Sequence, residues 1–111
     1  DEKINVYFFW GNGCQHCEAL ISYLNTLPEE YDNYFDLYTL EVWYNEDNSK
    51  LMTELGDYLE QEINGVPCLI IGDQVFIGFR EENKEAIKDA IKKVYNKKER
   101  YDVYKNYKEQ V

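Results

Sequence analysis

The first apolar run of the chain and the pattern behind it predict a strand followed directly by a helix. Residues 3–9 are β-branched or aromatic at most positions, which is typical of a strand buried on both faces of a parallel sheet. Residues 14–26 place apolar side chains at three- and four-residue steps, which predicts a helix with one inner face. Pro28 is expected to end this helix and to open a further short helical turn.

A second strand and helix are predicted in the middle of the chain. Residues 35–44 carry apolar side chains on both sides of a strand, and residues 45–48 form a polar turn with several potential helix N-caps. Residues 49–63 then repeat apolar positions at helical spacing. Gly56 lies within this helix and is expected to weaken it by about 1 kcal/mol relative to Ala.

The last third of the chain predicts a hairpin and a helix. Residues 68–71 form a short apolar strand, residues 72–74 a turn that contains glycine, and residues 75–79 the returning strand. Residues 81–95 have the pattern of an amphipathic helix. Its glutamates lie at the start and its lysines near the end, which is the arrangement that a helix dipole favours.

The predicted order of elements is β-α-β-α-β-β-α, which indicates an α/β fold with a mixed four-stranded central sheet flanked by helices. The length of 111 residues suits one domain, which we assign to residues 1–96. Residues 97–111 are basic and rich in tyrosine. We expect them to extend the last helix and pack back on the domain, and a partner-binding stripe is the alternative.

Charge is distributed unevenly along the chain, and this narrows the choice of partners. The formal net charge is −10, and residues 1–79 contain two basic side chains against 15 acidic ones. Residues 80–111 contain ten basic and seven acidic side chains. Because phosphates would be repelled by the acidic body, we expect no nucleic acid partner. No apolar run approaches the length of about 20 residues that a membrane span requires.

Three cysteines are too few and too unevenly placed for a disulfide scaffold. Cys14 and Cys17 are three positions apart, at the predicted junction of the first strand and helix. Two thiols there can exchange electrons with another thiol pair or help to hold zinc or an iron–sulfur cluster, with Cys68 or His16 as a further ligand. The sequence has no second CxxC and no other histidine, so a closed four-ligand site lacks members.

Two segments together resemble the thioredoxin superfamily. Residues 10–17, Trp-Gly-Asn-Gly-Cys-Gln-His-Cys, look like the active-site segment of that family, and residues 65–67, Gly-Val-Pro, look like the segment that carries its cis-proline. Gly78 lies where the family often has a glycine. The resemblance covers roughly residues 3–96. It implies a thioredoxin-like fold and a thiol–disulfide oxidoreductase that acts on protein thiols and disulfides, with a redox partner protein and no bound cofactor.

The resemblance also implies roles for individual residues. Cys14 is the expected nucleophile, because a helix N-terminus favours its thiolate, and Cys17 is the resolving thiol. Val66 and Pro67 are expected to align the backbone of a substrate, with Pro67 in the cis form; a trans turn proline is the alternative. Trp10 is expected to pack beside the dithiol and shape the docking surface, with core packing alone as the other interpretation.

His16 is the residue that bears most on the direction of electron transfer. A histidine beside the Cys14 thiolate would stabilise the reduced form and make the disulfide more oxidising, and an exposed histidine without a role is the alternative. His16 and Val66 are similar to residues of DsbA-type oxidases, whereas the small size resembles a thioredoxin. Many thioredoxins have a buried aspartate six residues before the first cysteine, and this chain has Phe8 there.

Two further predictions concern the orientation of Cys68 and the cellular compartment of the protein. Successive strand residues face opposite ways, so Cys68 should face the core if Pro67 faces the dithiol. A regulatory thiol or a third metal ligand is the alternative for Cys68. The first residue is Asp rather than Met, and this, with the oxidant-like CxHC motif, favours a location outside the cytosol, with a membrane anchor upstream as one option. We expect a monomer. A redox-inert interaction module with this fold is a further functional hypothesis.

Overall fold

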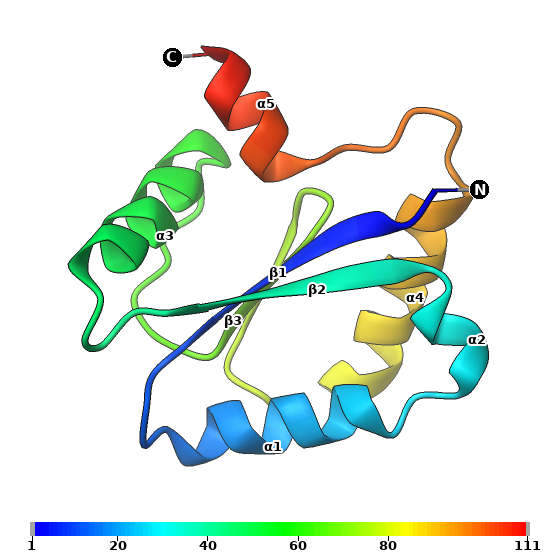
Figure 1. Cartoon of the computed structure of the whole chain (residues 1–111), viewed down its shortest axis with the longest axis horizontal. Helices are drawn as coiled ribbons and strands as arrows, with labels where there is room; N and C mark the ends of the chain where they lie inside the picture. The colour runs from blue at the N-terminus through cyan, green and yellow to red at the C-terminus, as the bar shows by residue number, and fades with distance from the viewer. Residues whose placement is uncertain (1, 111) are drawn as a thin grey trace.

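A mixed four-stranded sheet forms the centre of the molecule in the computed structural model, which describes residues 2–110 (Figure 1). The strands are β1 (Ile4–Trp10), β2 (Phe35–Glu41), β3 (Cys68–Ile71) and β4 (Gln74–Ile77). Their order across the sheet is β2-β1-β3-β4, in which β1 and β2 are parallel and the other two pairs are antiparallel. The predicted fold class is therefore confirmed.

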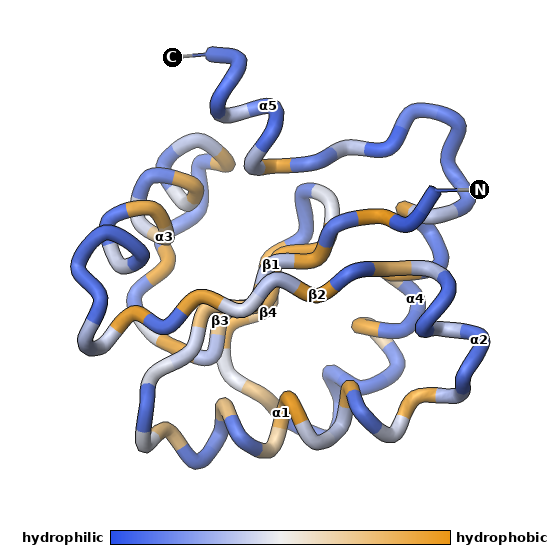
Figure 2. Tube along the Cα trace, in the orientation of Figure 1, coloured by the Kyte–Doolittle hydropathy of each residue, from blue (hydrophilic) through white to orange (hydrophobic). Residues whose placement is uncertain are grey.

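Helices cover both faces of the sheet. One face carries α1 (Gln15–Asn25), the short α2 (Glu29–Asp32) and α4 (Asn83–Asn96), and we call it the α1 face. The other carries α3 (Glu46–Tyr58) and α5 (Val103–Gln110), and we call it the α3 face. Figure 2 shows the apolar colouring concentrated in the strands and on the inward sides of these helices.

Each face of the sheet has its own core because β1 and β3 are buried on both sides. On the α1 face, Val6 and Phe8 of β1 pack with Leu20 of α1 and Ile91 of α4. On the α3 face, Phe9 packs with side chains from β3, α3 and α5. Each fully buried Leu, Ile or Phe side chain stabilises the fold by about 1.5–3 kcal/mol. The apolar run in β1 thus supplies both cores in alternation, as its sequence predicts.

Strand β2 ends earlier than predicted and forms an edge of the sheet. It stops at Glu41 instead of residue 44, because the Glu41 carboxylate accepts hydrogen bonds from the N–H groups of Trp43 and Tyr44. Those N–H groups are then unavailable to a β-ladder. Several of its side chains are exposed, Tyr38 to 48%. The expectation of a strand extending to Tyr44 was wrong.

Helix α3 is displaced from its predicted span of 49–63. It begins at Glu46 because the Asn45 side chain accepts the N–H of Asn48 at 3.0 Å and caps the helix. It ends at Tyr58, and Glu60 adopts a left-handed conformation with φ of 57°. Residues 60–63 then fold back, which brings the Gln61 carbonyl close to Gly56: a Cβ there would lie 2.8 Å from that oxygen. Gly56 is therefore required by a close approach and is more than a weak point in the helix.

The C-terminal segment forms a helix of its own instead of extending α4. Lys97 has an extended backbone, and residues 97–102 contain no helix. Asp102 then starts α5 by accepting the N–H of Lys105, and it also accepts hydrogen bonds from the side chains of Tyr7 and Asn5, each at 2.8 Å. Val103 is buried in the α3-face core. Val111, the last residue of the predicted tail, lies outside the described residues.

The hairpin and α4 differ only slightly from their predicted bounds. β4 begins one residue early, at Gln74, and ends at Ile77, before Gly78 with its φ of +81°. α4 begins at Asn83, two residues later than predicted. α2 follows Pro28 directly, with Pro28 as its N-cap. Among residues 2–110, no helix combines the length and the apolar character that a bilayer crossing requires.

Candidate redox site

The Cys14–Cys17 pair lies at the N-terminus of α1, where the two residues form a disulfide with a Cα–Cα distance of 5.2 Å. Cys14 is the N-cap of the helix, and its Sγ accepts the N–H of Cys17 at 3.1 Å. The chain reaches this position through residues 11–13, which we call the redox loop. Gly13 in this loop has a φ of +104°, a conformation that side chains disfavour.

The position at a helix N-terminus favours negative charge on Cys14. The first N–H groups of a helix lack intrahelical partners and carry the positive end of the helix dipole. One of them, from Cys17, already points at the Cys14 sulfur. Cys14 is 7% exposed and Cys17 2%, so Cys14 is the more accessible of the two residues. The assignment of Cys14 as the nucleophile and Cys17 as the resolving thiol stays a prediction.

Trp10 precedes the cysteine pair in the sequence and His16 lies between the two cysteines, and the structure places them in different settings. His16 lies in the first turn of α1 and is exposed to solvent. Trp10 is the last residue of β1, is partly buried and packs against the core cluster that contains both cysteines. The carbonyl of Trp10 accepts the N–H of Val42 at 2.8 Å, which ties the end of β2 to the end of β1.

The Val66–Pro67 segment lies directly before β3, and the peptide bond between the two residues is cis. Pro67 is fully buried, and its carbonyl accepts the N–H of Gly78 at 2.8 Å. Val66 is half-buried and packs against both core clusters, the one that contains Cys14 and the one that contains Cys68. Among residues 2–110, no hydrogen bond engages the N–H or the C=O of Val66, so both groups are free for another strand.

An apolar cavity of about 290 Å³ lies beside the buried sulfur of the pair. Phe8, Trp10, Ile21 and Cys17 contribute to its walls. Phe8 is 3% exposed, and it occupies the position where many thioredoxins have a buried aspartate. Glu18, on the first turn of α1, also lines this cavity.

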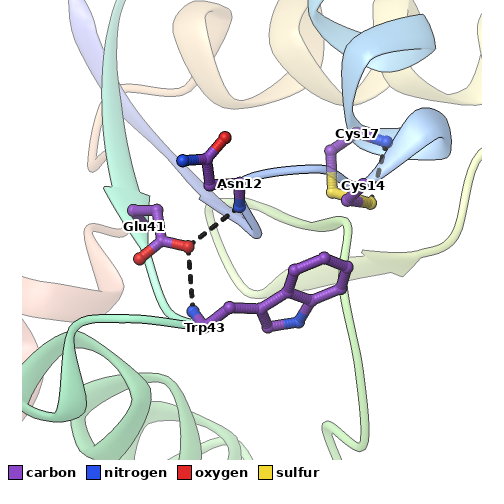
Figure 3. The surroundings of a disulfide bond; sticks show 5 residues. All are labelled: Asn12, Cys14, Cys17, Glu41 and Trp43. Carbon is purple, nitrogen blue, oxygen red and sulfur yellow. Dashed lines mark hydrogen bonds between the residues drawn. A yellow bond between two sulfur atoms is a disulfide. The ribbon is translucent and has the colours of Figure 1, made fainter.

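Two residues that sequence reasoning missed, Glu41 and Trp43, lie next to the redox loop (Figure 3). One oxygen of the Glu41 carboxylate accepts the N–H of Asn12 at 2.9 Å and that of Trp43 at 3.0 Å, and the other accepts the N–H of Tyr44 at 2.9 Å. Desolvation raises the pKa of Glu41, but the backbone N–H groups together lower it below the ordinary value.

A topological signal could have found these two residues. β1 and β2 are parallel, so the loops that follow them leave the same edge of the sheet. The loop after β1 leads to the cysteine pair, and the loop after β2 directly follows Glu41. The prediction of a strand through residue 44 hid this relation, because it placed Trp43 inside the sheet.

Cys68 lies away from the pair, on the α3 face. It is fully buried in that core, is not in a disulfide, and burial raises the pKa of its thiol from 9.0 to about 12. Cys14 and Cys17 belong to the core cluster of the α1 face, so the three cysteines do not gather at one site. Within the part of the chain that the structure describes, residues 2–110, no three His, Cys, Asp or Glu side chains are grouped so as to hold a metal ion.

Comparison with known proteins supports the fold. No protein-family model matches the chain, and no curated protein matches it. Among solved structures, a glutaredoxin from Archaeoglobus fulgidus superposes with a TM-score of 0.51 and 19% identity, covering 78% of this chain and 84% of the glutaredoxin. Glutaredoxin 1 from Francisella tularensis superposes with a TM-score of 0.50 and 21% identity, and the match covers 77% of this chain and 96% of that glutaredoxin.

The chain has the thioredoxin-like fold. This thioredoxin-like protein carries a CxxC pair at disulfide distance in the loop and first turn that follow β1. The fold and the pair together agree with the resemblance identified in the sequence.

Proposed function

We propose that this thioredoxin-like protein is a thiol–disulfide oxidoreductase that acts on protein substrates. The observation that carries the proposal is the Cys14–Cys17 disulfide at the N-terminus of α1, with a backbone N–H aimed at the Cys14 sulfur. A structural disulfide would join distant parts of the chain, whereas this one spans three residues and constrains little. These properties suit a disulfide bond that is repeatedly formed and reduced.

The chemistry proceeds by two exchanges of sulfur–sulfur bonds. In the reducing direction, the Cys14 thiolate attacks a substrate disulfide, forms a mixed disulfide and releases one substrate thiolate, which takes up a proton. The Cys17 thiolate then attacks the Cys14 sulfur, closes the Cys14–Cys17 disulfide and releases the second substrate thiol. Two electrons and two protons pass to the substrate. The oxidising direction is the reverse of these steps.

Several features of the site support roles in these steps. The helix N-terminus stabilises the Cys14 thiolate, so we expect the pKa of Cys14 in the reduced protein to lie below the free value of about 8.5. The free N–H and C=O of Val66 offer backbone pairing to a substrate strand, next to the cluster that contains Cys14. No step requires a bound cofactor, because the cysteine pair itself carries the electrons.

We propose that His16 shifts the balance towards oxidation. An imidazole in the first turn of α1 that donates a hydrogen bond to the Cys14 thiolate, or carries charge beside it, would stabilise the reduced protein and raise its reduction potential. Replacing His16 with Ala is then expected to make the potential more negative. For this two-electron couple, a tenfold change in the equilibrium constant corresponds to about 30 mV.

The compartment determines which direction operates, and we propose that the protein works outside the cytosol, where an oxidising dithiol has substrates. The CxHC motif supports this proposal. Attaching the full natural coding sequence to a reporter that is active on one side of the membrane tests it, and activity of a cytosolic reporter alone would contradict it.

The decisive experiment measures two properties of the purified protein: the reduction potential of the Cys14–Cys17 pair and the pKa of Cys14 in the reduced form. The proposal expects a pair that equilibrates with a glutathione or dithiothreitol buffer and a Cys14 pKa below about 8.5. Replacement of Cys14 with Ser serves as the control. A pair that does not cycle, together with an ordinary Cys14 pKa, would show that the protein is not an oxidoreductase.

A further inference from the structure

The indole of Trp43 lies flat against the redox loop. A Cβ placed on Gly11 would overlap the indole, and the indole atoms nearest to it are Cδ2, Cε2 and Cε3, which all belong to the six-membered ring. A face of that ring, and not its edge, therefore covers Gly11. The ring extends towards the disulfide, and its Cζ3 would lie 3.9 Å from a Cβ on Gly13, the residue directly before Cys14 (Figure 3).

The opposite face of the indole is open to solvent. Trp43 is 54% exposed, although one side of its ring is covered by Gly11, and the neighbouring Tyr44 is 80% exposed. Large aromatic side chains contribute most of their stabilising free energy when they are buried. An exposed aromatic face beside a reactive disulfide therefore contributes little free energy to folding, and it can contribute more when a binding partner covers it.

The backbone at Trp43 is held in place by hydrogen bonds. The adjacent Val42 is buried and donates its N–H to the Trp10 carbonyl at 2.8 Å. Glu41 holds the N–H groups of Trp43 and of Asn12 on one carboxylate oxygen. The indole thus presents its open face without further ordering of the chain, and this preorganisation lowers the entropic cost of binding.

The charge of the segments around the dithiol is negative. Glu18 follows the cysteine pair, Glu41, Glu46 and Asp47 surround Trp43 in the sequence, and Glu62 lies shortly before Pro67. The basic residue nearest to β4 on its C-terminal side is Arg80, and its side chain pairs with Glu82 at 3.8 Å. Residues 1–79 together contain two basic side chains and 15 acidic ones. Such a surface attracts cations and repels anions.

We propose that Trp43 is a specificity-determining residue, whose open face stacks against an arginine or lysine side chain beside the disulfide of the protein substrate. This inference rests on the proposed oxidoreductase function and names its substrate class: cystine-bearing segments with a positively charged neighbour. The π-face of tryptophan attracts cations more strongly than that of any other side chain. The surrounding carboxylates add long-range attraction, and Glu41 positions the ring.

The experiment uses three short peptides, each with one intramolecular disulfide and with Arg, Gln or Glu next to one cysteine. The measured quantity is the second-order rate constant with which the reduced protein opens each disulfide. In the wild type, the Arg peptide should react fastest and the Glu peptide slowest. In the Trp43→Leu variant, the Arg-to-Gln ratio should fall about two- to fivefold, the size of a cation–π interaction at an exposed site. Trp43→Phe should give an intermediate ratio.

Two controls separate direct stacking from the general acidic field. Tyr38→Leu removes a different exposed aromatic side chain, which lies in β2 and stacks on Tyr7 at 5.7 Å on the α3 face, and it should leave the Arg-to-Gln ratio unchanged. In salt of about 0.5 M, screening reduces the long-range preference, whereas the difference between the wild type and Trp43→Leu should persist because stacking acts at contact.

The outcomes are distinguishable from those of the proposed function. If the wild type reduces the small neutral hydroxyethyl disulfide but Trp43→Leu keeps the full Arg-to-Gln ratio, the docking inference is overturned and the oxidoreductase function stands. The same holds if the wild type reacts equally with the Arg and Gln peptides. If the reduced wild type does not open hydroxyethyl disulfide at all, the oxidoreductase function fails and the inference fails with it.

Discussion

The α1 face of the sheet holds Cys14 and Cys17 at a helix N-terminus, whereas the α3 face holds Cys68 at the start of strand β3. The same side chain has a different chemistry in the two settings. At the helix N-terminus, a backbone N–H points at the sulfur and favours the thiolate. Inside the sheet, desolvation raises the pKa of the thiol to about 12. Position relative to backbone dipoles and water, more than residue type, decides which cysteine can react.

The two faces also differ in how their surroundings are held. Around the dithiol, a side chain holds the loops together: the Glu41 carboxylate accepts hydrogen bonds from the N–H of Asn12 in the redox loop and from those of Trp43 and Tyr44 after β2. Around Cys68, the α3 face is closed by α5, which Tyr7 and Asn5 hold through the carboxylate of Asp102. One face therefore leaves aromatic surface exposed beside a reactive group, and the other covers its thiol with a helix.

The largest expected difference between the faces is in disulfide exchange. Cys14→Ser should reduce exchange with hydroxyethyl disulfide to the uncatalysed background, because it removes the attacking sulfur. Cys68→Ala should retain exchange near the wild-type rate, because Cys68 is buried in the other core. Stopped-flow rates of the three reduced proteins would measure this. Exchange that survives in Cys14→Ser and is lost in Cys68→Ala would reverse the assignment.

A pair of glycine substitutions tests how rigid each face is. Gly56→Ala, on the α3 face, should destabilise the fold by about 1–3 kcal/mol, because its Cβ meets the backbone oxygen of Gln61 at 2.8 Å and backbone moves reluctantly. Helix propensity alone predicts the opposite sign.

Gly11→Ala, on the α1 face, displaces the half-exposed indole of Trp43 instead, which can swing into solvent. It should change the unfolding free energy by less than about 1 kcal/mol and lower the Arg-to-Gln preference in exchange. Urea unfolding of both variants, with the peptide rates, provides the measurement. A stabilised Gly56→Ala protein would show that residues 60–63 do not press on α3.

The alkaline stability curve should report the buried thiol of the α3 face. The folded protein keeps the Cys68 thiol neutral to about pH 12, whereas in the unfolded chain it ionises near pH 9.0. Its contribution to stability is therefore complete below pH 9 and is lost as the pH rises towards 12, by up to about 1.4 kcal/mol per pH unit. Tyrosines titrate in the same range, so the comparison is with Cys68→Ala, which should lose stability less steeply.

The smallest expected effect lies on the acidic side of the curve, at the α1 face. The pKa of Glu41 is lowered in the folded protein, so Glu41 contributes stability above its ordinary pKa of 4.5, and this contribution is lost as the pH falls below that value. Glu41→Gln keeps an oxygen acceptor but no charge, and its stability should fall less steeply with acid. Thermal unfolding from neutral pH into the acid range measures the difference, and parallel curves would show that the carboxylate does not hold the loop as a charge.

Much of the fold and the centre of the site were predictable from local patterns. The apolar run of β1 and the helical spacing of α1 each specify their own element, because period-2 and period-3.6 burial need no knowledge of distant residues. The cysteine pair at their junction followed from those two elements. Glu41, Trp43 and the start of α5 were not predictable in this way, since each depends on a contact with a residue far along the chain.

The sequence by itself determined that strand, cysteine pair and helix follow one another, because side-chain period and helix capping are local properties. Only the tertiary structure decided what surrounds the pair. Parallel pairing of β1 and β2 brought Glu41 and Trp43 to the redox loop, and the glycine at position 11 gave the indole a flat surface to cover. The antiparallel pairing of β1 and β3, in which Cys68 lies opposite Phe9, placed Cys68 on the opposite face of the sheet. Neighbours across a sheet are set by strand order and register, and the residues within a single element do not encode either.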